Sequence, residues 1–265
     1  MLRFLILEDN CDAKVLGAPE AHVVQTSEMT LKTPLMVCCF PSAGVVGPIA
    51  AHAIIDQFKM EEIAHLRSKF MPSAAVFLEG RLRHPFRIYA HKELNLILVT
   101  AELPVADEGL YAVSSALLDW GASMGAREIV ILDGIPVQGM PSDRKVLYAA
   151  EEEKIADLAK DEQMDILDKG IITGIAGSIL SETLCRSMVG FALLTPAIAV
   201  IPDPGGALLL LEALNRLYNL KIDLTELKEG SEVIRRKMEE MAQQVDGMQR
   251  QQQMTGRSGY ERMYA

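Results

Sequence analysis

The sequence predicts an α/β fold: a mostly parallel sheet sandwiched between helices, with a C-terminal helix and a flexible tail. Three observations indicate this. Continuous Val/Ile/Leu runs, typical of strands buried on both faces, alternate with stretches of helical composition. Turns containing glycine or proline separate the two kinds of segment. A chain of 265 residues that is 49% hydrophobic can enclose one large core.

The predicted elements follow a repeating order of strand, turn and helix. Residues 1–33 mix short apolar stretches with acidic residues and predict one or two strands that lead into the main body. The first full unit is a strand over Leu35–Phe40, a turn over Pro41–Gly47 and a helix over Pro48–Phe58. Later strands are predicted at Leu94–Thr100, Glu128–Leu132, Ile171–Ile175 and Ala197–Ile201, and helices at Leu110–Met124, Ser178–Met188 and Ala207–Tyr218. Arg81–His91 is more typical of an antiparallel or edge element.

A change of composition near residue 224 divides the chain into three predicted parts. Residues 1–224 form the α/β domain, residues 225–247 an amphipathic helix, and residues 248–265 a tail without the apolar periodicity that packing needs. Apolar residues at heptad spacing on the helix indicate either a seam between subunits or, equally, packing on the helix's own domain. The seam residues are Leu227, Ile234, Met238, Met241 and Val245.

Charge and hydropathy exclude two classes of partner. The formal net charge is −10, with no basic stripe, so nucleic acid is excluded as the main partner. No apolar run reaches the ~18 residues that a membrane span requires, and Glu8 and Asp9 end the N-terminal run before it resembles a signal peptide. We therefore expect a cytoplasmic protein. Its four cysteines form no C-x-x-C pair and are expected to be buried and reduced: Cys11, Cys38, Cys39 and Cys185.

The glycine-rich turns do not match a known nucleotide motif. Gly44–Gly47 lacks the lysine of a phosphate loop and the glycine spacing of a dinucleotide fold. Gly174–Ser178 could present backbone N–H groups to an anion, although glycines at such a turn also serve close packing. Ser42 follows a strand and could act as a nucleophile, but a capping or turn serine is the better interpretation. The five histidines have no metal-binding spacing, and we expect neither metal nor cofactor.

Acidic residues follow several of the predicted strands. In open α/β sheets, ligands bind at the carboxyl ends of strands, where acids can ligate a metal or act as general bases. The other interpretation is helix capping, which suits Asp107 and Asp203 because each precedes a predicted helix. The acids concerned are Glu102, Asp107, Glu108, Asp133 and Asp203.

The last three residues, Met263, Tyr264 and Ala265, form a hydrophobic–tyrosine–any-residue sequence. An aromatic side chain and a terminal carboxylate at the end of a mobile linker suit capture in a pocket of a partner protein. One such peptide binds weakly, but several on one oligomer bind tightly through their effective concentration.

Residues 35–225 resemble the proteasome assembly chaperone family, particularly its archaeal members. The segments that carry the resemblance are Phe40–Gly47, Asp133-Gly134, Gly174–Gly177 and Pro202–Ala207. The resemblance implies an α/β sandwich similar to purine nucleoside phosphorylases, homo-oligomers and no established enzymatic activity. Some members carry a C-terminal HbYX motif that inserts between α-subunits of the proteasome core particle. In this chain the motif would be Met263, Tyr264 and Ala265.

Two functional hypotheses follow. In the first, the chain is an ATP-independent homo-oligomer that docks on proteasome α-rings through its tails, as an assembly chaperone, a gate-opening activator or both. In the second, it is a phosphorylase- or hydrolase-like enzyme that acts on a small metabolite through strand-end acids such as Glu102, Asp107 or Asp133.

Overall fold

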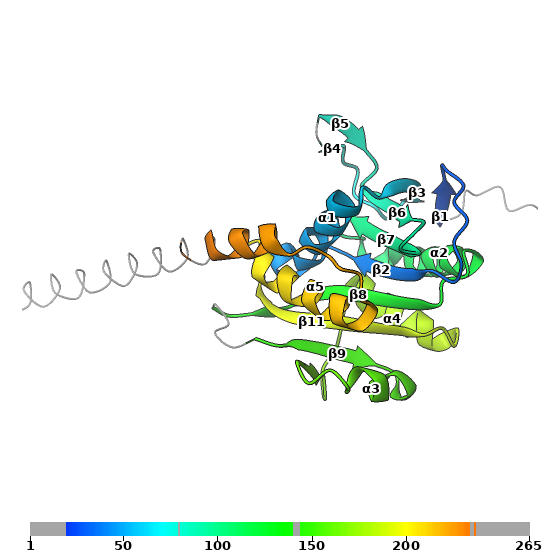
Figure 1. The fold of residues 1–265 in the computed structure, drawn as a ribbon. Coiled ribbons are helices and arrows are strands. Elements are labelled where there is room, and N and C mark those ends of the chain that lie inside the picture. Colours follow the sequence, from blue (N-terminus) through cyan, green and yellow to red (C-terminus); the bar gives the residue numbers. More distant parts are fainter. Residues whose placement is uncertain (1–19, 79, 140–143, 234–235, 237–265) are drawn as a thin grey trace, which may run out of the picture.

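A nine-stranded sheet runs through the molecule, with helices on both of its faces (Figure 1). The computed structural model describes residues 20–78, 80–139, 144–233 and 236. The strands are β1 (Ala21–Gln25), β2 (Leu35–Cys39), β3 (Glu61–Ser68), β4 (Val76–Leu78), β5 (Arg81–Arg83), β6 (Phe86–His91), β7 (Leu96–Ala101), β8 (Glu128–Val137), β9 (Val146–Ala150), β10 (Met164–Ile166) and β11 (Gly190–Ile198). The helices are α1 (Val46–Phe58), α2 (Leu110–Ser123), α3 (Glu152–Leu158), α4 (Gly174–Cys185) and α5 (Pro204–Tyr218), with short 3-10 turns η1 (Ala43–Val45) and η2 (Asp107–Gly109).

The α/β prediction is confirmed. The strand order is β1-β3-β6-β7-β2-β8-β11-β9-β10, and the central strands β7, β2, β8 and β11 are parallel. Antiparallel pairs flank this centre, from β7 outwards to β1 on one side and between β11 and β9 on the other. The predicted antiparallel element at Arg81–His91 corresponds to β5 and β6. The carboxyl ends of β2, β8 and β11 therefore point the same way, and β8 and β11 continue past the end of β2 to Val137 and Ile198.

Strand β2 shows why a continuous apolar run lies at the centre of the sheet. Leu35, Val37 and Cys39 belong to the core under α1 and α5, while Met36 and Cys38 belong to the core on the opposite face, which α2 and α4 cover. All five residues are buried, because successive side chains of a strand point to opposite faces. Burial of each large apolar side chain contributes about 1.5–3 kcal/mol relative to an exposed one.

Two predicted strands are wrong. Ile171–Ile175 is not a strand, because Ile171 is 90% exposed and α4 already begins at Gly174. Ala197–Ile201 is misplaced, because β11 spans Gly190–Ile198 and includes only Ala197 and Ile198 of that range; it pairs with β8 through Pro196. The proline is tolerated because the pairing of β11 with β9 has already ended at Leu194, so no strand needs the missing N–H on that side.

The cysteine prediction holds in part. Cys38 and Cys39 are free and fully buried in β2, whereas Cys185 is free but exposed at the end of α4. Cys185 departs from the prediction because it lies next to the exposed Leu184 on the solvent side of α4, whose last turn buries Thr183 instead. Cys11 lies outside the described residues.

Residues 225–233 are helical and follow α5. Leu227 packs against the core under α1 and α5, and Lys228 forms an ion pair with Glu212 of α5 (Nζ–Oε1 3.6 Å). For Leu227 the structure thus shows packing on its own domain, while Ile234, Met238, Met241 and Val245 lie outside the described residues. None of the helices in the described ranges is both long and apolar enough to cross a membrane.

Candidate functional site

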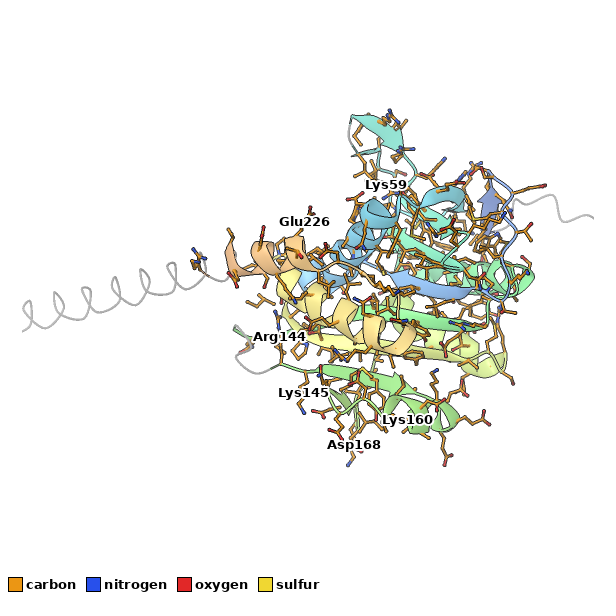
Figure 2. All side chains as sticks on the ribbon, in the orientation of Figure 1. Lys59, Arg144, Lys145, Lys160, Asp168 and Glu226 are labelled. Carbon is orange, nitrogen blue, oxygen red and sulfur yellow. The ribbon has the colours of Figure 1, made fainter. Side chains whose placement is uncertain are left out.

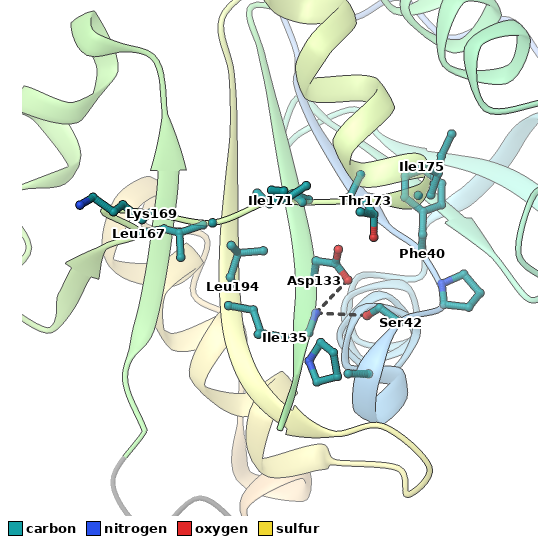
Figure 3. Close-up of a pocket in the computed structure, with 18 residues that line it drawn as sticks. Phe40, Ser42, Asp133, Ile135, Leu167, Lys169, Ile171, Thr173, Ile175 and Leu194 are labelled. Atoms are coloured by element: carbon teal, nitrogen blue, oxygen red, sulfur yellow. Dashed lines mark hydrogen bonds between the residues drawn. The ribbon is translucent and has the colours of Figure 1, made fainter. Parts of the chain in front are cut away.

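A pocket of about 480 Å³ lies beyond the carboxyl end of β2, against the middle of β11 and the second half of β8 (Figure 3). Its floor comes from the residues that follow β2, from the second half of β8 and from Leu194 of β11. Its other wall is the segment 167–173 together with the first turn of α4. This is the edge at which open α/β sheets bind ligands.

Asp133 and Ser42 form the polar part of the pocket floor. The backbone N–H of Gly134 donates to both Asp133 Oδ1 (2.8 Å) and Ser42 Oγ (3.1 Å). Burial raises the pKa of Asp133, and hydrogen bonds from Ser42 and Gly134 oppose that shift without cancelling it. The site therefore holds a carboxyl group whose protonated, hydrogen-bond-donating form is favoured relative to a free aspartate.

Gly134 allows the loop after β2 to cross close to β8. A Cβ atom at this position would lie 2.2 Å from the carbonyl oxygen of Ala43, a distance no side chain tolerates. Gly44 contributes a backbone φ of +67° within the same loop, which favours glycine. Gly134 and Gly44 are therefore required by the close packing and the backbone conformation of this loop.

The opposite wall combines apolar side chains with the N-terminus of α4. Thr173 occupies the N-cap position of α4 but makes no side-chain capping hydrogen bond, and Ile172 and Ile175 add apolar surface. The hydroxyl of Ser178 lies 2.8 Å from that of Ser114 in α2, so it belongs to the helix interface rather than to the pocket. Lys169 is an exposed cation at the rim.

The pocket can hold a small apolar group beside the Asp133 carboxyl group, but it lacks the histidine of a nucleophilic triad. The Ser42 hydroxyl hydrogen-bonds to the Asp133 carboxyl group, and no histidine lines the pocket. Nor do the described residues include a cluster of three or more His, Cys, Asp or Glu side chains placed to hold a metal ion.

The other strand-end acids are not gathered at this pocket. Glu102 accepts a hydrogen bond from the buried guanidinium of Arg87 (Nη2–Oε1 2.5 Å) and lies 3.8 Å from His52 Nε2. It lines a separate hollow beside α1 together with Glu226 (labelled in Figure 2). Its structural role is to neutralise Arg87.

Asp203 is a helix cap, as one interpretation of the sequence predicts. Its carboxylate accepts a hydrogen bond from the N–H of Gly206 (2.9 Å) and forms a bidentate ion pair with Arg144 (labelled in Figure 2). Asp107 and Glu108 lie exposed in η2, and neither caps that turn with its side chain. Only Asp133 of the five acids faces the pocket.

Sequence pattern does not predict the pocket wall at 167–173, because the apolar residues from Ile171 to Ile175 match a strand. The flanking pair Gly170 and Gly174, the latter with a φ of +68°, is the signal that could have indicated a turn into a helix. The predicted partner-binding residues Met263, Tyr264 and Ala265 lie outside the described residues.

Comparisons with known proteins agree on the family. A sequence model of the PAC2 family matches residues 36–242, more than half of the chain. A solved protein of unknown function from Thermoplasma acidophilum is 36% identical, covers 84% of this chain and 92% of its own, and has a TM-score of 0.71. Two solved Pyrococcus furiosus proteins are each 24% identical. PbaA, an archaeal homologue of proteasome-assembly chaperone, covers 93% of this chain and 100% of its own with a TM-score of 0.75. PbaB, an archaeal proteasome activator, covers 86% of this chain and 100% of its own with a TM-score of 0.76.

Proposed function

The chain belongs to the PAC2 family, and on that premise we propose that it is an ATP-independent, homo-oligomeric protein that docks on the α-ring of the proteasome core particle. The observation that carries the proposal is the family match over residues 36–242, together with the fold shared with a proteasome-assembly chaperone homologue and a proteasome activator. The contact is made by Met263, Tyr264 and Ala265, and its consequence is assembly of the core particle, opening of its gate, or both.

The sequence of the tail supports this mode of docking. Met263 and Tyr264 supply apolar area and a hydroxyl, and the proposal requires a free carboxylate on Ala265 to meet a cation or backbone N–H groups in the partner. A single peptide of this kind is a weak ligand, so several tails on one oligomer supply the affinity through effective concentration. No phosphate-loop motif occurs in the sequence, which agrees with action without ATP.

The body acts as a scaffold in this proposal. Leu227 and Lys228 fix residues 225–233 to the core and to α5, so the point at which the described chain ends has a defined position on the surface. In the proposed three-part organisation, the domain over residues 1–224 sets the spacing between subunits. The helix over 225–247 and the tail over 248–265 then present the docking residues to the α-ring.

The proposal is tested by capture and native mass measurement against assembled archaeal core particles and isolated α-rings, with peptide hydrolysis as a second readout. Deletion of Met263–Ala265, Tyr264→Ala and a Gly-Ser extension after Ala265 are each expected to abolish capture while the oligomer keeps its mass. Tyr260→Ala is the matched control, because it removes another tyrosine of the same tail and is expected to bind as well as the wild type.

The outcome also separates the two roles. A rise in peptide hydrolysis on binding indicates an activator, and faster formation of core particles without such a rise indicates an assembly chaperone. Undiminished capture of the Tyr264→Ala protein would contradict the proposal.

The metabolite-enzyme hypothesis depends on Asp133 alone, since Glu102 and Asp203 are engaged in ion pairs and Asp107 lies exposed elsewhere.

A further inference from the structure

The β4–β5 hairpin projects from the body of the molecule (top of Figure 1). Its two strands pair only with each other, and Phe77 lies directly opposite Leu82, with both side chains exposed. We call the segment that carries this hairpin, residues 71–78 and 80–84, the arm. A two-stranded ribbon is marginally stable alone in water, so the position of the arm depends on how its two ends are attached to the body.

The two ends of the arm are attached in different ways. At its start, Phe70 packs so closely on Gly109 that a Cβ atom there would lie 2.2 Å from Phe70 Cβ, and the Phe70 carbonyl accepts a hydrogen bond from the Ala106 N–H (3.1 Å). At its end, the ring of His84 stacks on the ring of His65 in β3, with centroids 3.5 Å apart and planes 3° apart. Of these attachments, the stacked pair is the one whose charge can change between pH 5 and 8.

His65 occupies a site that disfavours a positive charge. The residue is 6% exposed, and its Nδ1 has no hydrogen-bond partner among the described residues. Protonation turns both ring nitrogens of an imidazole into donors, so a charged His65 would hold a buried N–H without an acceptor. Burial lowers the pKa of His65, and the neighbouring His84, Arg67 and His22 lower it further.

The groups that face His65 from the adjoining strands are basic. Arg67 follows two residues later on the same face of β3, and His22 of β1 lies opposite Arg67. On β6 the directly opposite residue is Arg87, which is fully buried and forms an ion pair with Glu102. The acid next to this group is therefore already paired with an arginine.

No carboxylate of the described residues forms an ion pair with His65 or His84. Glu62 of β3 pairs with Arg83, the residue before His84 (Nη1–Oε2 3.6 Å). Two protonated rings in the stack would repel each other with no counter-ion among the described residues. Arg87 donates to the carbonyl oxygen of His84 (2.7 Å), so the backbone at this point stays attached to β6 when the rings separate.

We propose that the stacked His65–His84 pair is a proton-sensitive latch, which holds the arm against β3 while both rings are neutral and releases it on acidification. The arm then swings about the backbone of His84, and the direction in which it presents Phe77 and Leu82 depends on pH. The latch goes beyond the proposed docking function and does not depend on it.

The size of the effect follows from the sign of the pKa difference. The pKa of His65 is lower in the stacked state than in a free imidazole, so the latch contributes fully above about pH 6.5 and weakens as the pH falls below that value. A free imidazole is ~90% protonated at pH 5.5. Opening of the latch is therefore expected to be about tenfold more favourable at pH 5.5 than at pH 7.5 for each ring that must stay neutral.

Amide hydrogen exchange of the full-length protein at pH 7.5 and 5.5 tests the latch. Protection factors in the arm are expected to fall about tenfold at the lower pH, while those of β2 and β8 stay unchanged. His65→Phe combined with His84→Phe keeps a stacked aromatic pair that cannot titrate and is expected to abolish the fall. The matched control is His91→Gln, which removes a histidine of β6 whose Nδ1 accepts from the Leu94 N–H (3.1 Å), and the fall is expected to persist.

A titration of the histidine ring protons of the wild-type protein by NMR gives a second test that needs no variant. Titration of His65 is expected to occur together with the loss of protection in the arm. Titration of His65 as a free imidazole while the arm stays protected would overturn the inference, and so would arm protection that is the same at both pH values. A fall that persists in the double phenylalanine variant would also overturn it. None of these readouts involves the proteasome, so failure of the docking proposal is detected separately.

Discussion

Replacing Glu102 with alanine is expected to destabilise the protein strongly, although the residue takes no part in the proposed docking. The side chain of Arg87 is fully buried, and its guanidinium donates to Tyr89 Oη (2.8 Å), to the carbonyl oxygen of His84 (2.7 Å) and to Glu102 Oε1 (2.5 Å). Of these three acceptors only Glu102 is charged. Its removal leaves a buried cation with two neutral partners.

The size of this destabilisation depends on the solvent exposure of the Arg87–Glu102 ion pair. Breaking a fully buried ion pair by removing one partner costs about 3–5 kcal/mol. The Glu102 side chain is 22% exposed, so water entering its place offsets part of this cost, and we expect a loss near the lower limit, ~3 kcal/mol. In a protein of this size that corresponds to a fall in Tm of about 6–12 °C.

The assay is denaturant unfolding at fixed protein concentration, since assembly contributes to apparent stability. Asp107→Ala is the control, because this strand-end acid is exposed and unpaired among the described residues, and its loss is expected to cost under about 0.5 kcal/mol. Arg87→Met combined with Glu102→Gln is expected to recover most of the stability by removing both charges. A Glu102→Ala protein as stable as the Asp107→Ala control would refute the reasoning.

Two further predictions concern the pocket. Gly134→Ala is expected to cost about 1–3 kcal/mol in unfolding free energy because its Cβ would overlap the Ala43 carbonyl, whereas Gly230→Ala, in open space on the last described helix, is expected to stabilise slightly. The raised pKa of Asp133 means that its contribution to stability is full below pH ~4 and is lost as pH rises through the raised value. Asp133→Asn, which keeps an acceptor for the Gly134 N–H, is therefore expected to be more stable than the wild type at pH 8 but not at pH 3.5; equal stability at pH 8 would contradict this.

The sequence predicts those elements whose signals lie in neighbouring residues of the chain. The continuous apolar run at Leu35–Phe40 identifies β2, and the interpretation of Asp203 as a helix cap is confirmed, although α5 begins at Pro204 and not at the predicted Ala207. The same logic places Asp133 just after a strand, but Asp133 lies within β8, which continues to Val137. Local pattern also fails at Ile171–Ile175, whose apolar residues line a pocket wall instead of pairing with another strand.

What the sequence could not predict depends on contacts between distant residues. Glu102 is a plausible catalytic acid until the fold brings the buried Arg87 guanidinium against it, fifteen residues earlier in the chain. The Phe77–Leu82 pair is equally invisible to pattern, because three-residue strands are too short to show alternation. The tail motif differs from these two examples, because its three residues are adjacent in the sequence and are identified without knowledge of the fold.

The proposed function requires the last three residues to make the contact with the proteasome. The decisive measurement is the structure of the full-length protein bound to an archaeal core particle. We expect Met263, Tyr264 and Ala265 to lie between adjacent α-subunits, with the α/β bodies above the ring. A complex held by the bodies, with those pockets empty, would contradict it.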